Sequence, residues 1–453
     1  EDAESVVGAQ QLTAVSWSAV FGEVELSAAE IQRLAMQAKP LVQSRGKWVA
    51  LDHADLAEAA AALAERADTT ELTGAEMLRH ALGLEGGGIS GGVTLAGTSW
   101  ASDLLRAAAS VDSEPVLQPD GFLGELRSYQ GEAVEWLNFL DEAGLGGCLA
   151  LDMGLGKTPT VLARIASNNQ ASPSLVVAPP AVVGNWAAEA RRFTPTLNIL
   201  VHHGPSRSNG AELQSRIRGA DLVITTYGTA VRDIEELARV EWDRAVLDEA
   251  QVIKNHRSAT AKELRRLNAR TRLALTGTPI ENGLGDLWAI MDFCNPGLVG
   301  GRTSFINQLS EVGDAAVAAE SALLALNGVL VFRRTKSEPL IAAELPDRID
   351  ELAHCTMTPE QIGLYQAVLD KLVRDTADSE QNTTQQKGVV LAAITALKQI
   401  CNHPLNYDKE DPNLDLEGRS GKLTRLNEII DAVFAADERI LIFTHFATWG
   451  EKL

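Results

Sequence analysis

The sequence is poor in cysteine, and its cysteines lack the spacings that bind metals or build a disulfide framework. Only four occur in 453 residues, none in a C-x-x-C pair: Cys148, Cys294, Cys355 and Cys401. The segments His202-His203 and Cys401-Asn402-His403 have no second ligand pair at a useful distance in the sequence. These absences argue against a metal site built from them and favour reduced thiols packed in a cytosolic protein.

Long apolar segments and a leader sequence are absent as well. No run of about 18 uninterrupted apolar residues is present, so the sequence predicts no membrane span. The first ten residues, EDAESVVGAQ, are acidic and lack the basic start and apolar centre of a signal peptide. They also lack an initiator Met, so we expect the chain to begin inside a longer protein or after processing.

An excess of positive charge, which marks proteins that bind nucleic acid by simple electrostatics, is missing too. The formal net charge is −21 at pH 7. Much of it lies near the start, because residues 1–120 carry seven Lys and Arg against eighteen Asp and Glu. The remaining chain is proportionally less acidic, so a local basic groove is compatible with the total charge but is not predicted by it.

The length predicts two to four domains, and the sequence pattern changes near residues 115–122. Residues 1–118 are rich in Ala, Leu and Glu, and three segments have helical spacing: 26–42, 53–67 and 73–84. A short strand is expected at 46–52, within GKWVALD. We therefore expect an acidic accessory domain of mixed but mainly helical structure, which ends in the loop sequence SVDSEPVLQPDG.

From residue 122 to 296 short apolar strands alternate with helices. This alternation predicts an α/β fold in which helices cover both faces of a parallel sheet. The expected strands are Cys148–Leu151, Leu175–Ala178, Ile199–His202, Leu222–Thr225, Ala245–Leu247 and Leu273–Leu275. Residues 297–418 are predicted to form a helical insertion and linker. Residues 419–453 are predicted to open another α/β unit with a helix and the strand ILIFTHF.

A candidate phosphate-binding loop lies in GCLALDMGLGKTPT (147–160). The strict P-loop pattern G-x-x-x-x-G-K-[ST] requires a glycine where this chain has Leu151, but an apolar strand precedes the loop and a helix follows it, as in genuine P-loops. We expect Lys157 to neutralise the nucleotide's β- and γ-phosphates and Thr158 to ligate Mg²⁺. Backbone N–H groups at the helix N-terminus are expected to face the phosphates. The residues predicted to surround the nucleotide here are Met153, Gly154, Leu155, Gly156, Lys157 and Thr158.

Two further motifs follow later strands of the same sheet. In AVLDEAQ, Asp248 and Glu249 have the Walker B arrangement, in which Asp248 holds Mg²⁺ and Glu249 orients and deprotonates the attacking water. In LALTGTPIEN, Thr276-Gly277-Thr278 follows another apolar strand. A solvated acidic turn and a structural turn are the simpler interpretations of each motif alone. Their order after a P-loop favours a nucleotide site in which the TGT element senses the nucleotide state.

Eight motifs occur in one order along roughly three quarters of the chain, from residue 122 to the end. They are LRSYQ (126–130), DMGLGKT (152–158), VVAPPAVVGNW (176–186), ITTYG (224–228), DEAQ (248–251), LTGTPIEN (275–282), FRRTK (332–336) and LKQICNHP (397–404). This set resembles the SWI/SNF-type ATPases of helicase superfamily two. Family members characteristically have an acidic residue where this chain has Leu151, so the absent P-loop glycine is a family trait. The resemblance implies a RecA-like P-loop lobe with a helical insertion.

The resemblance also implies roles for the matching residues. Gln130 would contact adenine, with Arg127 nearby. The implied catalytic residues are Lys157, Asp248, Glu249 and Gln251, the last of which stands where relatives often have His. Thr276, Gly277 and Thr278 would couple the ATP site to a DNA track. The residues in motifs implied to contact the backbone of one DNA strand are Pro179, Pro180, Asn185, Trp186, Thr225, Thr226 and Tyr227. Backbone contacts position a duplex without reading its sequence.

A basic element of the family, RRTK, is matched by Arg333, Arg334 and Lys336, and the resemblance places it in the helical insertion near the interlobe cleft. Residues within 1–118 faintly resemble the helicase-associated domain that precedes the motor in many bacterial members. The chain ends at the first strand of a second lobe, which supplies arginine fingers in such motors. We therefore expect the chain to bind ATP but to hydrolyse it poorly.

The function implied by the resemblance is an ATP- and Mg²⁺-dependent translocase on double-stranded DNA, cytoplasmic and associated with the nucleoid. Such a motor remodels protein–DNA complexes without separating the strands, and RNA polymerase or another DNA-bound protein is its candidate target. Two alternatives are an RNA-directed motor of the same superfamily and a nucleotide-dependent interaction module that does not hydrolyse ATP.

Overall fold

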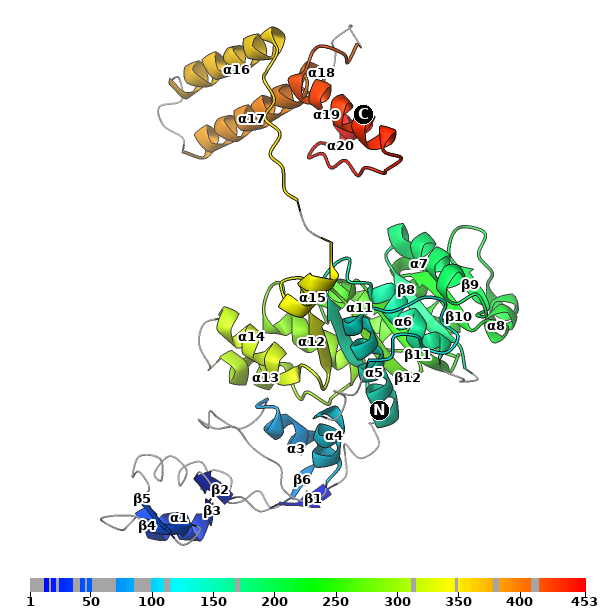
Figure 1. Cartoon of the computed structure of the whole chain (residues 1–453), viewed down its shortest axis with the longest axis vertical. Helices are drawn as coiled ribbons and strands as arrows, with labels where there is room; N and C mark the ends of the chain where they lie inside the picture. Colours follow the sequence, from blue (N-terminus) through cyan, green and yellow to red (C-terminus); the bar gives the residue numbers. More distant parts are fainter. Residues whose placement is uncertain are drawn as a thin grey trace. The chain divides into compact units, whose positions relative to one another are not determined.

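The structure is a computed structural model of the chain. It describes residues 12–15, 18–21, 24–35, 41–44, 47–50, 71–84, 99–109, 115–167, 172–310, 315–346, 349–377, 383–408 and 415–453. The chain divides into two compact units, Glu1–Pro346 and Asp347–Leu453. Most of their helices and strands are labelled in Figure 1, and each unit is described by itself.

The core of the first unit is a seven-stranded sheet in the order β13-β7-β12-β11-β8-β10-β9, with all neighbouring strands parallel. The strands are β7 (Gly147–Leu151), β8 (Ser174–Ala178), β9 (Ile199–His202), β10 (Leu222–Thr226), β11 (Trp242–Asp248), β12 (Ala269–Leu275) and β13 (Val331–Arg334). Four of them, β7, β8, β10 and β11, are buried along their whole length, as a parallel sheet with covered faces requires. All six predicted strands are confirmed, and each lies within one of these elements.

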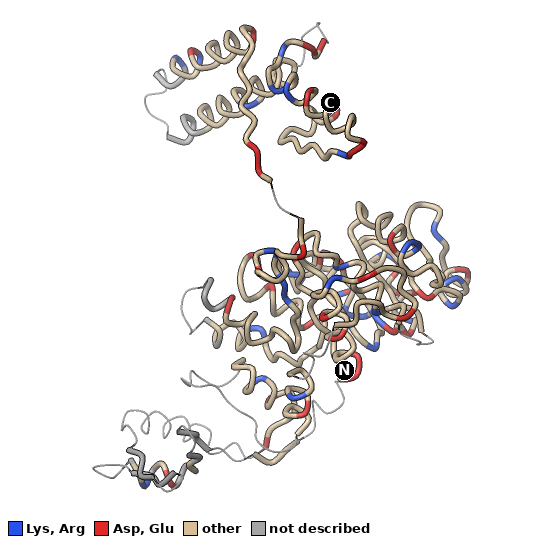
Figure 2. Tube along the Cα trace, in the orientation of Figure 1, with Lys and Arg blue, Asp and Glu red and all other residues tan. Residues whose placement is uncertain are grey.

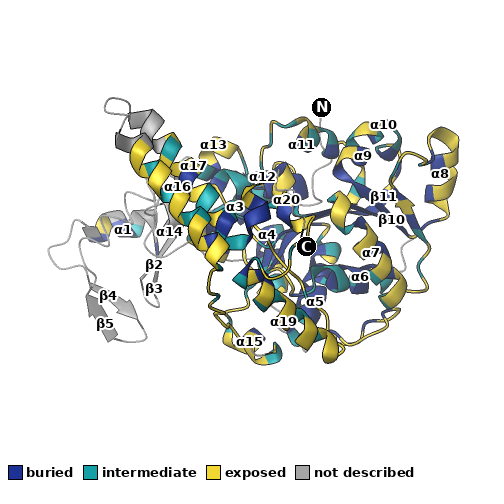
Figure 3. Cartoon of the chain, turned by 90° about the horizontal axis from the view of Figure 1, so that it is seen from above, coloured by how far each residue is buried: buried dark blue, intermediate teal, exposed yellow. Residues whose placement is uncertain are grey.

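Helices cover both faces of this sheet. On one face α5 (Ser128–Ala143) packs against α6 (Lys157–Ala166), and α6 packs against α7 (Pro180–Phe193). On the other, α11 (Ala259–Leu264) contacts α9 (Tyr227–Arg232) and the short 3₁₀ helix η1 (Ala250–Ile253), which contacts α12 (Leu284–Cys294). Figure 3 shows β10 and β11 between these two groups. The unit also contains α8 (Gly210–Arg218), α10 (Ile234–Leu237), α13 (Arg302–Ser310), α14 (Ala315–Leu326) and α15 (Pro339–Glu344).

The sequence pattern misses strand β13, which pairs in parallel with β7 at the edge of the sheet. Packing on α5 explains its position: the rings of Phe332 and Trp136 are 5.7 Å apart, and Trp136 Nε1 donates a 3.2 Å hydrogen bond to the Val329 carbonyl. The prediction that the RRTK element lies in a helical insertion is therefore wrong, because its two arginines end an edge strand of the sheet. Lys336 follows them in the turn before α15.

The described part of residues 1–118 combines short antiparallel strand pairs with helices. The pairs are β1 (Leu12–Ala14) with β6 (Glu71–Thr73), β2 (Ser18–Phe21) with β3 (Val24–Ser27), and β4 (Leu41–Ser44) with β5 (Lys47–Ala50). The helices are α1 (Ala28–Ala35), α3 (Gly74–Ala81) and α4 (Trp100–Ala109). Thr73 and Glu76 form a capping box at the start of α3, which explains why this helix begins there. The helix predicted at 53–67 lies outside the described residues.

The second unit contains α16 (Pro359–Ala377), α17 (Thr383–Asn402), α18 (Pro404–Tyr407), α19 (Gly421–Ala435) and α20 (Ala447–Gly450). Helices α16 and α17 pack together, and the Gln361 amide donates a 2.7 Å hydrogen bond to the carbonyl of buried Ile400. The interval 297–418, predicted as one insertion and linker, is thus divided: α13, α14 and α15 belong to the first unit, and α16 to α18 belong to the second.

The strand predicted in ILIFTHF is wrong for this structure, since residues 440–446 have no strand conformation. Leu441 and Phe443 are 86% and 91% exposed. A strand needs a neighbouring strand to pair its backbone groups, and the part of this unit that the structure describes contains none. Among all described residues, no helix combines the length and apolarity needed to cross a bilayer. Basic and acidic residues are interspersed along the first unit (Figure 2).

Candidate functional site

Three motifs that lie far apart in the sequence meet at one edge of the sheet. Strands β7, β12 and β11 are parallel neighbours, so their carboxyl ends lie side by side. The P-loop follows β7, Thr276 follows β12, and Asp248 is the last residue of β11. The carboxyl ends of parallel strands are where α/β folds bind ligands. The structure therefore brings together the predicted phosphate, metal and coupling residues.

The P-loop conformation depends on two glycines. Gly154 and Gly156 have φ angles of 82° and 81°, in the left-handed region that favours glycine. At Gly156 a side chain would also collide with the amide of Gln130. Leu151, where the strict pattern has glycine, is fully buried in β7 and has no such requirement.

Lys157 is the first residue of α6 and bends back over the loop. Its Nζ donates a 3.0 Å hydrogen bond to the Leu151 carbonyl, and it forms no ion pair with an acid among the described residues. A phosphate oxygen can replace this single bond with a stronger, charge-assisted one. Two left-handed glycines, a helix N-terminus and this lysine fit the phosphates of a nucleotide.

Gln130 supports the loop from within the protein. Its Nε2 donates a 3.0 Å hydrogen bond to the Leu155 carbonyl, and its Oε1 accepts one from the Arg127 backbone N–H. Only 8% of the Gln130 surface is exposed. Because both ends of the amide are engaged, the structure assigns Gln130 to holding the P-loop, and its contact with adenine stays a prediction. The Arg127 guanidinium donates to the Glu344 carbonyl at the end of α15.

Asp248 is a buried carboxylate held in a fixed orientation. It accepts a 2.8 Å hydrogen bond from Trp186 Nε1 on one oxygen and a 3.0 Å bond from the Glu249 backbone N–H on the other. The pKa of Asp248 is raised, mainly because the carboxyl group is buried. The hydrogen bond from Trp186 acts in the opposite direction and lowers this pKa. Among the described residues, no three His, Cys, Asp or Glu side chains are grouped closely enough to hold a metal ion. Mg²⁺ at Asp248 and Thr158 would therefore need nucleotide phosphate oxygens as further ligands.

Glu249 has a strained backbone, with φ 52° and ψ 57° at the start of η1. A bulky residue rarely adopts this left-handed conformation, and such strain tends to persist at functional sites. Its carboxylate accepts a 2.9 Å hydrogen bond from Gln251 Nε2, and Gln251 Oε1 accepts a longer 3.4 Å bond from the Thr276 hydroxyl. Thr276 Oγ1 in turn accepts a 3.1 Å bond from the Thr278 N–H. These bonds connect the Walker B motif to the predicted coupling element.

Four of the predicted DNA contacts have side chains that this structure places in the interior. Trp186 donates to Asp248, and the Tyr227 hydroxyl donates a 2.7 Å hydrogen bond to the Asp248 carbonyl. The hydroxyls of Thr225 and Thr226 bond to the His202 carbonyl and the Thr229 hydroxyl. These four side chains are at most 8% exposed, and the predicted contact of their motifs with DNA stays a prediction. Pro180 and Asn185 on α7 are exposed, and Pro179 is half-buried.

Asp152 and Lys336 also meet at this edge, in a contact that the sequence motifs do not predict. The Asp152 carboxylate accepts a 2.9 Å hydrogen bond from the Lys336 backbone N–H, and the Asp152 N–H donates a 3.1 Å bond to the Arg334 carbonyl. The sequence marked both the P-loop and RRTK, but nothing in either motif indicates that they touch. The pairing of strand β13 with strand β7 brings the two motifs into contact.

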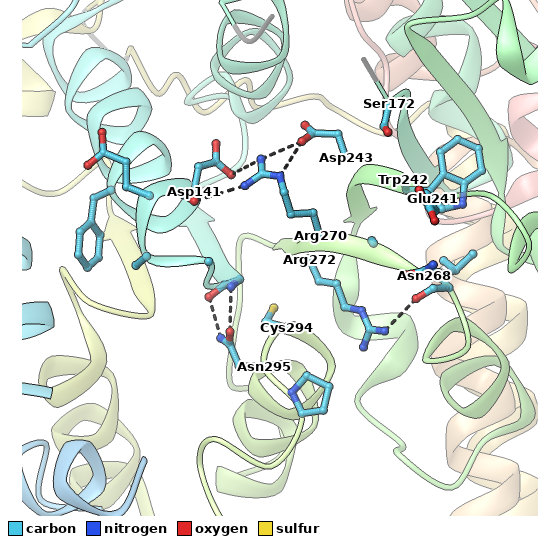
Figure 4. A pocket seen from close by; sticks show the side chains of 18 of the residues that line it. Asp141, Ser172, Glu241, Trp242, Asp243, Asn268, Arg270, Arg272, Cys294 and Asn295 are labelled. Carbon is cyan, nitrogen blue, oxygen red and sulfur yellow. Dashed lines mark hydrogen bonds and ion pairs between the residues drawn. The ribbon is translucent and has the colours of Figure 1, made fainter. Parts of the chain in front are cut away.

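A cleft of about 1260 Å³ in the first unit lies elsewhere, at the amino ends of β11 and β12. In Figure 4, Arg270 lies between Asp141 and Asp243. Its Nη2 is 2.8 Å from the Asp243 carboxylate and 3.3 Å from that of Asp141. None of the predicted site residues lines this cleft. The pairing of Arg270 with both carboxylates indicates a structural role for these three residues.

Comparisons with known proteins identify the family of this chain. A profile of the SNF2-related domain matches residues 129–406, and one described as SNF2 Helicase protein matches residues 1–82. YwqA of Bacillus subtilis, whose name describes an ATP-dependent helicase/translocase, is 35% identical over 99% of this chain and 50% of its own length. The chromatin-remodeling ATPase INO80 of Arabidopsis thaliana is 33% identical over 68% of this chain and 22% of its own.

Two further proteins are similar to more than half of this chain. The TATA-binding protein-associated factor mot1 of Schizosaccharomyces pombe is 32% identical over 62% of this chain and 16% of its own. The solved SWI2/SNF2 ATPase core of Sulfolobus solfataricus in complex with dsDNA shares 36% identity, covers 74% of this chain and 70% of that chain, and has a TM-score of 0.47. The chain spans half the length of YwqA and less of the other curated relatives. Since the SNF2-related profile covers more than half of the sequence, the chain belongs to the SNF2-related family of ATPases.

Proposed function

We propose that this chain carries the ATP-binding part of a motor that hydrolyses ATP and moves along double-stranded DNA. Movement would displace or rearrange proteins bound to the duplex, without separating its strands. ATP and Mg²⁺ are the proposed cofactors. A DNA-bound protein is the proposed partner, with RNA polymerase as one candidate.

The path of hydrogen bonds from Glu249 through Gln251 to Thr276 is the observation that carries the proposal. In hydrolysis Lys157 and the N–H groups of α6 would bind the phosphates, and Glu249 would orient the attacking water and accept its proton. Mg²⁺ held by Thr158 and Asp248 would supply charge neutralisation at the terminal phosphates. A change at Glu249 on hydrolysis reaches Thr276 through Gln251, which gives ATP turnover a physical route to the rest of the lobe.

Helix α7 supports the DNA part of the proposal. Asn185 is exposed, whereas its neighbour Trp186 donates to the buried Asp248 carboxylate. A duplex held at the exposed start of α7 would therefore act on the orientation of Asp248 through one helix. INO80 and mot1, whose names describe a chromatin-remodeling ATPase and a TATA-binding protein-associated factor, support remodelling of DNA-bound proteins as the outcome.

Because this chain by itself is expected to hydrolyse ATP poorly, the test uses a motor that contains both this chain and a whole second lobe. Its ATP turnover is measured with duplex DNA, single-stranded DNA and RNA of equal length. We expect duplex DNA to stimulate turnover about tenfold or more. We expect Lys157→Ala to abolish it, since positioning and electrostatic stabilisation of the phosphates supply most of the catalysis in phosphoryl transfer. Stimulation by RNA instead would favour an RNA-directed motor. Equal turnover with and without every nucleic acid would contradict the proposal.

A further inference from the structure

The turn that follows β13 is held against the P-loop by backbone hydrogen bonds. Arg334 is opposite Leu151 in the parallel pair, so the chain leaves β13 where the P-loop leaves β7. Asp152 then connects the two segments: its N–H donates to the Arg334 carbonyl, and its carboxylate accepts from the Lys336 N–H. The position of Lys336 is therefore determined by the sheet.

The ammonium group of Lys336 lies beside the phosphate-binding loop. Its Nζ is 3.4 Å from the point where a side chain on Gly154 would begin. Gly154 belongs to the exposed part of the loop, and Lys336 is itself exposed. Within the described part of the chain, this ammonium group forms neither an ion pair nor a side-chain hydrogen bond. It is a positive charge without a partner, next to the backbone that would hold phosphate.

Neighbouring side chains of the same segment are engaged in structural contacts. Arg334 is 2.8 Å from the Glu132 carboxylate and stacks over the Phe332 ring at 4.3 Å. The Glu338 carboxylate accepts a 2.6 Å hydrogen bond from the Thr335 N–H, which orders the turn around Lys336. At the far end of α15, Glu344 accepts hydrogen bonds from Arg127 and Ser128 at the start of α5. The turn is thus anchored on both sides, and Lys336 is free to serve a ligand.

We propose that Lys336 is a second phosphate-binding residue of the nucleotide site, which contacts the terminal phosphates of ATP together with Lys157. The inference rests on the proposed function and adds to it a residue from a different strand. Lys157 reaches the phosphates from the helix after β7, and Lys336 reaches them from the turn after β13. A polyphosphate carries several negative charges, so two cations bind it more strongly than one through charge-assisted hydrogen bonds.

Titration of the complete 453-residue chain with ATP, ADP and AMP, followed by calorimetry, tests this contact without depending on turnover. For Lys336→Ala we expect ATP affinity to fall about five- to twentyfold, as for one charge-assisted hydrogen bond near the surface. The loss for ADP should be smaller, and AMP affinity should not change. Lys336→Arg keeps the charge and should stay within about twofold of the original affinity.

Arg218→Ala is the matched control. Arg218 is exposed on α8, which follows β9 at the opposite edge of the sheet, so this variant also loses one positive charge but leaves the P-loop intact. We expect it to bind all three nucleotides as the original chain does. A general electrostatic effect would weaken ATP binding equally in Arg218→Ala and Lys336→Ala, and that result would overturn the inference.

Acylation of lysines in the unaltered chain provides a second measurement that needs no variant. ATP should protect Lys336 from an amine-reactive reagent, while AMP should not. If ATP fails to protect Lys336, or if Lys336→Ala binds ATP normally while Lys157→Ala does not, Lys336 has no phosphate contact and the proposed function stands. If the unaltered chain binds no ATP, the proposed function and the inference both fail.

Discussion

The two ends of the parallel strands differ in how their charged residues are paired. We call the side where the strands begin the amino edge of the sheet and the side where they finish the carboxyl edge. At the amino edge, the Asp141 carboxylate pairs with Arg164 at 2.7 Å and also with Arg244 and Arg270. At the carboxyl edge, Lys157 and Lys336 have no acidic partner within ion-pair distance among the described residues. The cleft of about 1260 Å³ is at the amino edge. The carboxyl edge holds these two lysines and the strained backbone of Glu249.

This difference shows why cleft size alone does not locate the site. Buried charges that are fully paired maintain a structure, since removing one partner leaves the other uncompensated in a poorly solvated place. Groups with perturbed titration or strained geometry tend to belong to a functional site. Asp248 is such a group, because burial raises its pKa.

The largest expected effect is at the carboxyl edge, in Glu249→Gln. The amide keeps the shape of the side chain but cannot accept a proton from water. We expect ATP turnover to fall about a hundredfold to ten-thousandfold, as for loss of a general base. ATP affinity should remain, measured by the same titration. Normal turnover in this variant would remove Glu249 from the chemistry and weaken the contrast between the two edges.

At the amino edge the largest effect should be on stability. Asp141→Ala leaves the Arg244 guanidinium, 2% exposed, without its carboxylate. We expect the free energy of unfolding to fall by about 3–5 kcal/mol, measured by urea denaturation. The fraction that remains folded should bind ATP with unchanged affinity.

Asp103→Ala is the control for that experiment, because Asp103 lines the same cleft but forms only an exposed pair with Arg106. Its loss should change stability by less than about 1 kcal/mol. If Asp141→Ala weakened ATP binding while the protein stayed folded, the amino edge would belong to the functional site and the comparison would fail.

The smallest effect should come from Gln251→Ala, which interrupts the path from Glu249 to Thr276. We expect ATP binding to be unchanged and stimulation of turnover by duplex DNA to fall about tenfold or less, in the range of coupling free energies between linked sites. Turnover without DNA should change less than turnover with DNA. Equal loss in both conditions would indicate that Gln251 acts in the chemistry and has no part in coupling.

Local sequence determined most of what surrounds the nucleotide site. Each strand of the sheet from β7 to β12 contains a short apolar run, and the P-loop, the DEAQ motif and the TGT element each follow such a run, so strand, turn and helix could be assigned there without the fold. The glycines at 154 and 156 are also explained by local sequence, because the positive φ angles that they adopt are a requirement of the loop itself. Family resemblance then indicated which turns bind nucleotide.

Contacts between distant segments could not be derived in this way. The hydrogen bonds of Trp186 and Tyr227 to Asp248 are examples, because the packing of α7 and α9 on the sheet brings these side chains there. The stretch ILIFTHF has the composition of a strand, yet it forms none, because a strand also needs a partner to satisfy its backbone.

The sequence by itself determined the α/β class and the order of the motifs, and it predicts the chemistry of Lys157, Asp248 and Glu249, because these depend on residue type and on neighbours along the chain. Only the tertiary structure decided that β13 pairs with β7 and brings Lys336 to the P-loop. Pairing between strands separated by about 180 residues depends on which apolar surfaces pack together across the whole lobe, and no short stretch of sequence carries that information.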